Sequence, residues 1–308
     1  MMRVSLRQLA YFEHLAEVLH FGRAAQLAGV TQPALSAQIA ELEGQLGVRL
    51  FERGRGAIRL TAEAIELRPR IQRILAEVED LEHAARRGRD ILQGRFGLGV
   101  IPTVAPYLLP HLLPRLKESH PGLQLELREA ITDTLLEELR NGHLDAIIAA
   151  EPLERSDVDQ LALFRDPFLL AVSREEVARI APPVAHESMS LERLMLLEEG
   201  HCMRAQALAI CSKVQPVAMQ SFGATSLATL LQMVSHGLGV TLIPEIARNS
   251  AEQLPGISIL PFAQPVPYRD ICLAWRKTNP RHKDFEALAE SVRKAHRTLV
   301  ASLSSALP

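Results

Sequence analysis

The chain has 308 residues, of which 47% are hydrophobic and 23% charged, a composition that supports two or three folded domains and argues against wholesale disorder. Three cysteines are too few for a disulfide scaffold. Neither a signal peptide nor an unbroken apolar stretch of membrane-spanning length is found, so we expect a cytoplasmic protein with no membrane partner. The net charge of −2 leaves nucleic-acid binding open, because one basic surface is sufficient for it.

Positive charge gathers near the N-terminus. Residues 1–73 contain ten arginines and seven glutamates, a net charge of +3, whereas the first lysine of the chain is Lys117. Four of these arginines fall within residues 49–59. Such a region can bind DNA phosphates or can be an ordinary solvated surface, and charge alone does not decide between the two.

The apolar residues have the spacing of an α-helix from the start of the chain. Apolar residues recur every three or four positions from Leu6 to Leu19, and a short second helix is predicted over residues 23–28. Thr31 can cap a third helix, which Gly47 ends. The apolar face of that third helix consists of Leu35, Ile39, Leu42 and Leu46.

A basic hairpin is predicted next, with strands over residues 50–51 and 58–60. The predicted order of elements is that of a winged helix-turn-helix: a helix, a short helix, a turn, a long helix and a hairpin. In this motif the third helix enters the major groove of double-stranded DNA. Gln32 and Ser36 lie opposite the apolar face, and glutamine can read adenine through paired hydrogen bonds. Arg53 on the wing is expected to contact phosphates or the minor groove. A three-helix core without DNA binding is the alternative.

Residues 9–61 resemble the DNA-binding domain of LysR-type transcriptional regulators. The resemblance is carried by residues 21–25, 31–36, 42–43, 46–47 and 50–53. It implies that DNA is approached by Gln32, Pro33, Ser36 and Arg53, and we add Thr31 at the helix start and Arg55 on the wing. Ala37 and Ala40 stand where many relatives carry a basic residue, so fewer phosphate contacts from the third helix are expected.

Residues 62–93 are predicted to form a linker helix that pairs two copies of the chain. Apolar residues recur in alternating steps of four and three from Leu67 to Ala85, the spacing of a heptad repeat. Packing against its own chain is the alternative, but a winged helix that reads a pseudo-palindromic DNA site needs a dimer. Pro69 predicts a bend or boundary near the start, and residues 86–94 predict a hinge.

Strands and helices alternate after residue 94. The first predicted strands are 96–101, 123–129 and 144–149, and the helices between them are 107–118 and 135–140. This βαβαβ order predicts a parallel sheet. A second α/β stretch follows over residues 166–265, then a strand over 268–275 and a helix over 283–299.

We therefore predict an α/β fold class, made of a winged helix-turn-helix (1–61), a linker helix (62–93) and a two-lobed regulatory domain (94–308). The two lobes resemble a periplasmic-binding-type fold, with lobe I at about 94–165 and 268–300 and lobe II at about 166–267. In such folds a ligand occupies the cleft between the lobes, at the carboxyl ends of the strands.

Thr103 and Thr132 are predicted to lie at the carboxyl ends of strands, beside the cleft between the lobes. Each follows a predicted strand and precedes a predicted helix, so each could simply cap its helix. Two caps at neighbouring strand ends also direct backbone N–H groups into one cleft, which suits a small polar ligand.

Cys202 and Cys211 lie nine residues apart in a stretch that favours helix. A rise of about 1.5 Å per residue separates their Cα atoms by about 13 Å on opposite faces, whereas a disulfide requires about 7 Å or less. The two can join only if the helix unfolds. His201, Arg204 and the helix N-terminus favour a reactive thiolate at Cys202. Two buried structural cysteines are the commoner alternative, and neither metal nor cofactor binding is predicted from this spacing.

The same stretch resembles the members of the LysR-type family that sense hydrogen peroxide, as do residues 101–110, 224–227 and 237–242, and the resemblance covers nearly the whole chain. It implies that Cys202 is the peroxidatic thiol and Cys211 the resolving thiol. It also implies that a peroxide pocket is formed by Thr103, Thr132, His201 and Arg269. Ala205 stands where an acidic residue is usual, and Cys272 is expected to be buried and inert.

We predict a transcriptional activator of oxidative-stress genes, not an enzyme, in which hydrogen peroxide joins Cys202 to Cys211 in a disulfide. The resemblance further implies a homodimer or homotetramer and contact with RNA polymerase. A LysR-type regulator of a non-covalently bound organic effector is the alternative, and it would not need Cys211. A thiol peroxidase is disfavoured by the DNA-binding half of the chain.

Overall fold

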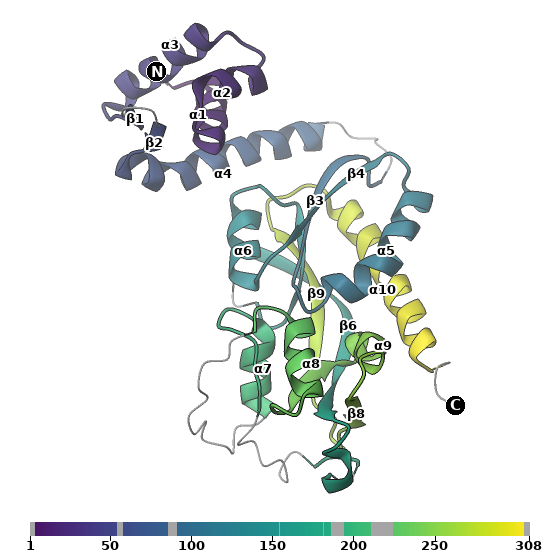
Figure 1. Cartoon of the computed structure of the whole chain (residues 1–308). Coiled ribbons are helices and arrows are strands. Elements are labelled where there is room, and N and C mark those ends of the chain that lie inside the picture. The colour runs from purple at the N-terminus through teal and green to yellow at the C-terminus, as the bar shows by residue number, and fades with distance from the viewer. Residues whose placement is uncertain are drawn as a thin grey trace. The chain divides into compact units, whose positions relative to one another are not determined.

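The computed structural model describes residues 4–53, 58–85, 91–153, 155–180, 182–185, 194–210 and 224–304. Three parts of the sequence-based predictions lie outside the described residues, namely Arg55, Cys211 and residues 86–90 of the predicted hinge. The chain forms two compact units, residues 1–87 with 140–143 and residues 88–139 with 144–308 (Figure 1). No helix among the described residues is both long enough and apolar enough to cross a membrane.

The first unit begins with three helices, α1 (Leu6–Val18), α2 (Phe21–Leu27) and α3 (Gln32–Leu46). Their apolar faces enclose a core in which Phe12, Leu35 and Leu42 are fully buried. α2 begins two residues before its predicted start, because the His20 ring accepts a hydrogen bond from the Arg23 backbone N–H and caps the helix. The three helices that the periodicity predicts are therefore present.

The predicted hairpin is also present, with β1 (Phe51–Arg53) antiparallel to β2 (Ile58–Leu60). The Glu43 carboxylate of α3 accepts hydrogen bonds from the backbone N–H groups of Leu50 and Phe51, at 2.8 and 3.2 Å. These bonds fix the wing against the third helix. Together the helices and the hairpin confirm the predicted winged helix-turn-helix.

The linker helix is α4 (Ala62–Ala85), which begins at the first residue of the predicted range 62–93, where the Thr61 hydroxyl accepts a hydrogen bond from the Ala64 N–H at 3.1 Å. Residues 91–93 of that range are not helical. Pro69 lies inside α4 and is not a helix boundary. Arg68 holds α4 to α1, because its Nη2 lies 2.7 Å from Oε1 of Glu13.

The heptad positions of α4 differ in their burial. Ile71 is buried in the core of the first unit, but Ile74 and Leu81 are 45% and 68% exposed. The first two apolar positions, Leu67 and Ile71, thus pack against their own chain, as the alternative in the sequence suggests. Ile74 and Leu81 present apolar side chains to solvent in the single chain.

The second unit begins with the predicted βαβαβ arrangement, made of β3 (Gly94–Val100), α5 (Ala105–Ser119), β4 (Leu123–Glu129), α6 (Thr132–Arg140) and β5 (Ala146–Ala150). β3 pairs parallel with both β4 and β5, which confirms the parallel sheet. Gly99 lets α6 pack closely on β3, since a Cβ at this position would lie 2.8 Å from the side chains of Leu135 and Leu144.

One strand belongs to both lobes. β6 (Val158–Ser173) first pairs with β9 (Tyr268–Arg276) in the lobe I sheet and then with β7 (Thr241–Pro244) and β8 (Ile257–Pro261) in lobe II. The sequence places a change of lobe at residues 165–166, and β6 runs straight through that point. The strand order is β4-β3-β5-β9-β6-β7, with β8 also paired to β6.

Helices cover both sheets of the second unit. Lobe II carries α7 (Cys202–Ile210), α8 (Leu227–Ser235), α9 (Arg248–Glu252) and the short 3-10 helices η1 (Val177–Arg179) and η4 (Glu245–Ala247). The last helix, α10 (His282–Ser304), returns to lobe I and packs along α5 (Figure 1). Each lobe has its own apolar core, so a site between them is bounded by two well-packed bodies.

Candidate functional site

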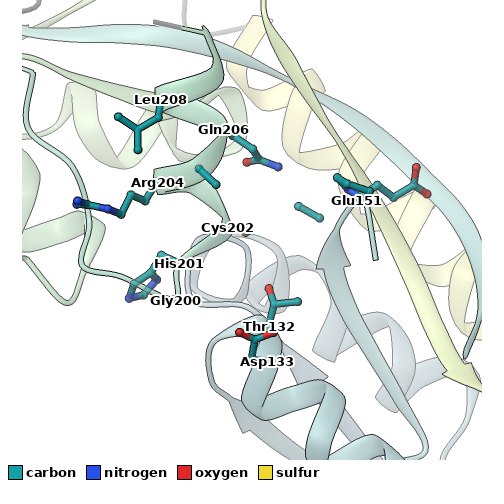
Figure 2. A pocket seen from close by; sticks show the side chains of 12 residues that line it. Thr132, Asp133, Glu151, Gly200, His201, Cys202, Arg204, Gln206 and Leu208 are labelled. Carbon is teal, nitrogen blue, oxygen red and sulfur yellow. The ribbon is translucent and has the colours of Figure 1, made fainter. Parts of the chain in front are cut away.

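A cavity of about 450 Å³ lies among the described residues, where α7 of lobe II meets the start of α6 and the end of β5 in lobe I (Figure 2). Three of the residues predicted from the sequence line it, namely Thr132, His201 and Cys202. The cavity therefore lies at the carboxyl ends of strands between the lobes, where the predicted fold places a ligand.

Cys202 is the first residue of α7 and joins the two lobes. α7 is anchored in lobe II by Met203 and Ala207, which are buried in the lobe II core. The half-buried Cys202 packs instead against the core of lobe I, and its thiol is free. Any displacement of Cys202 therefore removes a contact between the lobes.

Gly200 makes this close approach possible. Its φ of +90° lies in the left-handed region that favours glycine, and a Cβ at this position would lie 2.7 Å from Cδ1 of Ile131 in lobe I. Any other residue would strain the backbone here and would displace the end of the Ile131 side chain. The glycine two residues before Cys202 thus sets the position of the thiol.

The charges around Cys202 differ from those expected. Burial lowers the pKa of His201, an effect that Glu198 partly opposes, so the imidazole is neutral near pH 7 and is not a fixed positive charge. The Arg204 guanidinium donates to the Leu197 carbonyl at 3.1 Å. In Figure 2 the His201 and Arg204 side chains both point away from Thr132. Of the three features expected to favour the thiolate, the helix N-terminus has the geometry to do so.

Two polar atoms on the cavity wall lack partners. Thr132 Oγ1 and Gln206 Oε1 are both buried and have no hydrogen-bond partner among the described residues. Thr132 therefore does not cap α6 with its hydroxyl, which removes the simple explanation of its place in the sequence. Buried polar groups are usually paired, so these two atoms are exceptions among the described residues.

Thr103 and Arg269 lie together in a different environment. Arg269 is 2% exposed, and its Nη1 and Nη2 donate to the Thr103 hydroxyl at 2.7 Å and to the Thr103 carbonyl at 3.0 Å. Thr103 does not cap a helix either, because Val104 occupies the N-cap of α5. Neither Thr103 nor Arg269 lines the cavity at Cys202. The structure thus divides the four predicted pocket residues into two pairs.

Asp166 completes the second pair and is not evident from the sequence. Its Oδ2 accepts hydrogen bonds from Nε and Nη2 of Arg269, at 3.0 and 2.8 Å, and both side chains are fully buried. Its Oδ1 accepts the Ile246 backbone N–H of lobe II at 3.2 Å. Asp166 and Arg269 face each other in the β6–β9 ladder, so the network joins the first loop of lobe I to lobe II.

The predicted DNA-facing residues gather at the start of α3. Thr31, Gln32 and Pro33 are exposed, and Ser36 is half-buried one turn later. Thr31 occupies the N-cap position, but its side chain makes no capping hydrogen bond, contrary to expectation. The backbone of Arg53 belongs to β1 on the wing.

The third cysteine does not take part in either site. Cys272 of β9 is fully buried, which confirms the prediction, and burial raises the pKa of its thiol to about 12. A thiol with such a pKa stays protonated at neutral pH and is a poor nucleophile. Within the part of the chain that the structure describes, no group of three or more His, Cys, Asp or Glu side chains could hold a metal ion.

Comparison with known proteins agrees with this architecture. Residues 6–65 match the bacterial regulatory helix-turn-helix protein family lysR, and residues 89–297 match the LysR substrate binding domain. The chain is 37% identical over 302 residues to a hydrogen peroxide-inducible genes activator from Dickeya chrysanthemi, and the match covers 98% of this chain and 99% of that protein.

Two solved structures are also similar. One is a full-length cysteine-to-aspartate variant of OxyR from Pseudomonas aeruginosa, with 37% identity, a TM-score of 0.79 and coverage of 94% of this chain and 97% of that one. The other is a cysteine-to-serine variant of OxyR from Corynebacterium glutamicum with hydrogen peroxide bound. Its identity is 30% and its TM-score 0.68, over 99% of this chain and 96% of that one.

Proposed function

The chain belongs to the LysR family of bacterial transcriptional regulators, and we propose that it senses hydrogen peroxide through a disulfide between Cys202 and Cys211. The observation that carries the proposal is the place of Cys202, which begins a lobe II helix yet packs on the core of lobe I. The relatives support it, because one is named a hydrogen peroxide-inducible genes activator and a similar OxyR structure contains hydrogen peroxide.

The chemistry takes two steps. The Cys202 thiolate attacks one oxygen of hydrogen peroxide and the O–O bond breaks, which oxidises the sulfur to a sulfenic acid. The leaving hydroxide takes up the proton that the thiol released and becomes water. The Cys211 thiol then attacks the Cys202 sulfur, which forms the disulfide and releases a second water. The partial positive charge at the N-terminus of α7, where Cys202 lies, favours the thiolate.

Helix α7 makes this disulfide a switch. The eight steps from Cys202 to Ile210, the last residue of α7 and the one before Cys211 in the sequence, span about 12 Å along the intact helix. Disulfide formation therefore requires α7 to unfold, which withdraws Met203 and Ala207 from lobe II and Cys202 from lobe I. Both lobe contacts change at once, and we propose that the change alters how two or four copies of the chain bind DNA and contact RNA polymerase.

A direct test is mass mapping of the full chain after one equivalent of hydrogen peroxide, together with DNA footprints of the reduced and oxidised protein. We expect a peptide pair joined through Cys202 and Cys211 and a changed footprint. Two results would contradict the peroxide proposal. One is a Cys202 that remains a thiol after treatment. The other is a regulatory activity that depends on an organic effector and persists in the Cys211→Ser variant.

Sequence-specific recognition of DNA is expected to depend on Gln32, which is exposed in the first turn of α3. Gln32→Ala should reduce the discrimination between a duplex selected by the wild-type protein and a scrambled duplex by about 1–3 kcal/mol, because a bidentate base contact is lost. Gln45→Ala, in the last turn of the same helix, is the matched control and should leave discrimination unchanged. Equal losses on both duplexes would assign Gln32 to the DNA backbone.

Dimerisation is expected to use the exposed apolar positions of α4. Leu81→Lys should raise the dimer dissociation constant about a hundredfold or more, because two buried leucines contribute about 1.5–3 kcal/mol each. Ile65→Lys is the control, since Ile65 is 61% exposed on the same helix but lies outside the heptad pattern. Sedimentation of the DNA-free protein measures both variants, and an unchanged Leu81→Lys dimer would place the interface elsewhere.

A further inference from the structure

A strained residue lies where the described part of the second unit begins. Leu92 has a φ of +54°, in the left-handed region that a bulky side chain rarely adopts, yet its side chain is only 1% exposed and belongs to the core of lobe I. It lies seven residues after Ala85, the last residue of α4, and two residues before β3 begins. A strained conformation of this kind persists only where neighbouring groups fix it.

The Asp284 carboxylate holds Leu92 from the start of α10. Its Oδ1 accepts a hydrogen bond from the Leu92 backbone N–H at 3.0 Å, and its Oδ2 accepts one from Nε of Arg281 at 2.7 Å. Asp284 lies in the first turn of α10, where the partial positive charge of the helix N-terminus favours a carboxylate. One side chain thus joins the strained turn to a helix 192 positions further along the chain.

Arg281 extends the contact to β3. Its side chain is buried, its Nη1 donates to the Arg95 carbonyl at 2.8 Å, and its guanidinium lies 4.7 Å from the centre of the Phe96 ring. The same Nη1 lies 3.4 Å from Oδ1 of Asp145, and Oδ2 of Asp145 accepts the Gly97 backbone N–H at 2.8 Å. Charge-assisted hydrogen bonds of this kind are stronger than neutral ones, so the turn at Leu92 and the start of β3 are held as one piece.

We propose that Leu92, Arg281 and Asp284 form a linker clamp, which fixes the direction in which the chain runs from α4 into the regulatory domain. When several copies of the chain bind one DNA duplex, a fixed direction sets the spacing at which their winged helices meet the duplex. Asp284 acts through Leu92 and not on DNA, so it is a positioning residue. The inference goes beyond the proposed function, because it needs only DNA binding and applies to the protein without any peroxide.

Hydrogen exchange of the reduced full chain tests the contact itself, in wild type, Asp284→Ala and Glu286→Ala. Glu286 is exposed two residues further along α10, so its variant controls for the loss of a carboxylate from the same helix. We expect the Leu92 amide to exchange at least about tenfold faster in Asp284→Ala than in the wild type, because its N–H loses its acceptor. Glu286→Ala should exchange as the wild type does.

A lengthened DNA duplex tests the consequence. A duplex selected by the wild-type protein is compared with one that has five base pairs inserted at the centre of the footprint, which turns its two sides by about half a helical turn. Wild type and Glu286→Ala should lose affinity at least about tenfold, whereas Asp284→Ala should lose less than about threefold, because a looser connection tolerates a changed spacing. On a duplex that holds one side of the footprint the three affinities should agree within about twofold, since no residue of the winged helix is changed.

Three results would overturn the inference. One is an unchanged Leu92 exchange rate in Asp284→Ala, the second is an equal loss of affinity in wild type and Asp284→Ala on the lengthened duplex, and the third is a wild type that tolerates the insertion. Trp275 fluorescence in a denaturant titration shows whether the variant is folded, and Asp284→Ser replaces it with the same expected results if it is not. A failure of the peroxide proposal leaves these measurements unaffected, because none of them uses peroxide.

Discussion

Oxidation of the wild-type protein is expected to remove hydrogen-exchange protection from residues 203–210, while the Cys211→Ser variant should keep it. Before oxidation α7 (Cys202–Ile210) is helical, and the backbone N–H groups beyond its first turn are protected by helical hydrogen bonds. The disulfide needs Cα atoms within about 7 Å, which the helix does not allow. Without Cys211 no bond can bring the two ends of the helix together.

The cysteine variants separate the two chemical steps. Cys211→Ser should accumulate a sulfenic acid at Cys202 that a dimedone-type probe traps, followed by over-oxidation, whereas Cys202→Ser should not react at this site. Cys272→Ser is the control and should behave as the wild type, because its buried thiol has a pKa raised to about 12. Unchanged wild-type protection after mapped disulfide formation would show that α7 does not unfold.

The second large effect is expected from Asp166→Asn, which should destabilise the regulatory half of the chain by about 3–5 kcal/mol. The substitution keeps the shape of the side chain but removes the only negative partner that the described residues give to the buried Arg269 guanidinium. Trp275, the single tryptophan of the chain, lies on β9 and reports unfolding of this half by its fluorescence in a denaturant titration.

A neighbouring ion pair provides the control. Arg165 and Asp270 occupy the adjacent position of the β6–β9 ladder and form an ion pair of 3.1 Å, but their side chains are 60% and 38% exposed. Asp270→Asn should therefore cost no more than about 1 kcal/mol. The double change Asp166→Leu with Arg269→Met should recover much of the lost stability, since an apolar pair leaves no buried charge. Equal effects of Asp166→Asn and Asp270→Asn would show that burial does not decide the cost.

The elements that the sequence predicts well are those fixed by local spacing. The period of the apolar residues predicts α1 and α3, and alternating strands and helices predict the parallel sheet of lobe I. The residues between the two cysteines favour helix and so predict that a helix separates them, and α7 ends one residue before Cys211. Each of these inferences needs only the pattern within one element or the order of neighbouring elements along the chain.

The features that the sequence does not predict depend on residues far apart in the chain. β6 carries polar residues and an irregular register near Leu163, so its 16 residues show no single strand pattern. The contact between Asp166 and Arg269 joins residues 103 positions apart and depends on the register of two strands. Thr103 and Thr132 have the same local context, yet one binds a buried arginine and the other faces a cavity. Only the tertiary arrangement separates them.

The continuity of β6 also decides where this domain can be divided. Lobe I is made from two separate stretches of the chain, and removing lobe II at residues 166–267 would cut β6 in the middle and take Asp166 away from Arg269. Neither lobe can therefore be expressed, exchanged with a relative or duplicated as a separate module without rebuilding a strand. Recombination of this protein with its relatives is expected to preserve the regulatory half as a single inherited block, with crossovers confined to the surface loops outside β6 and β9.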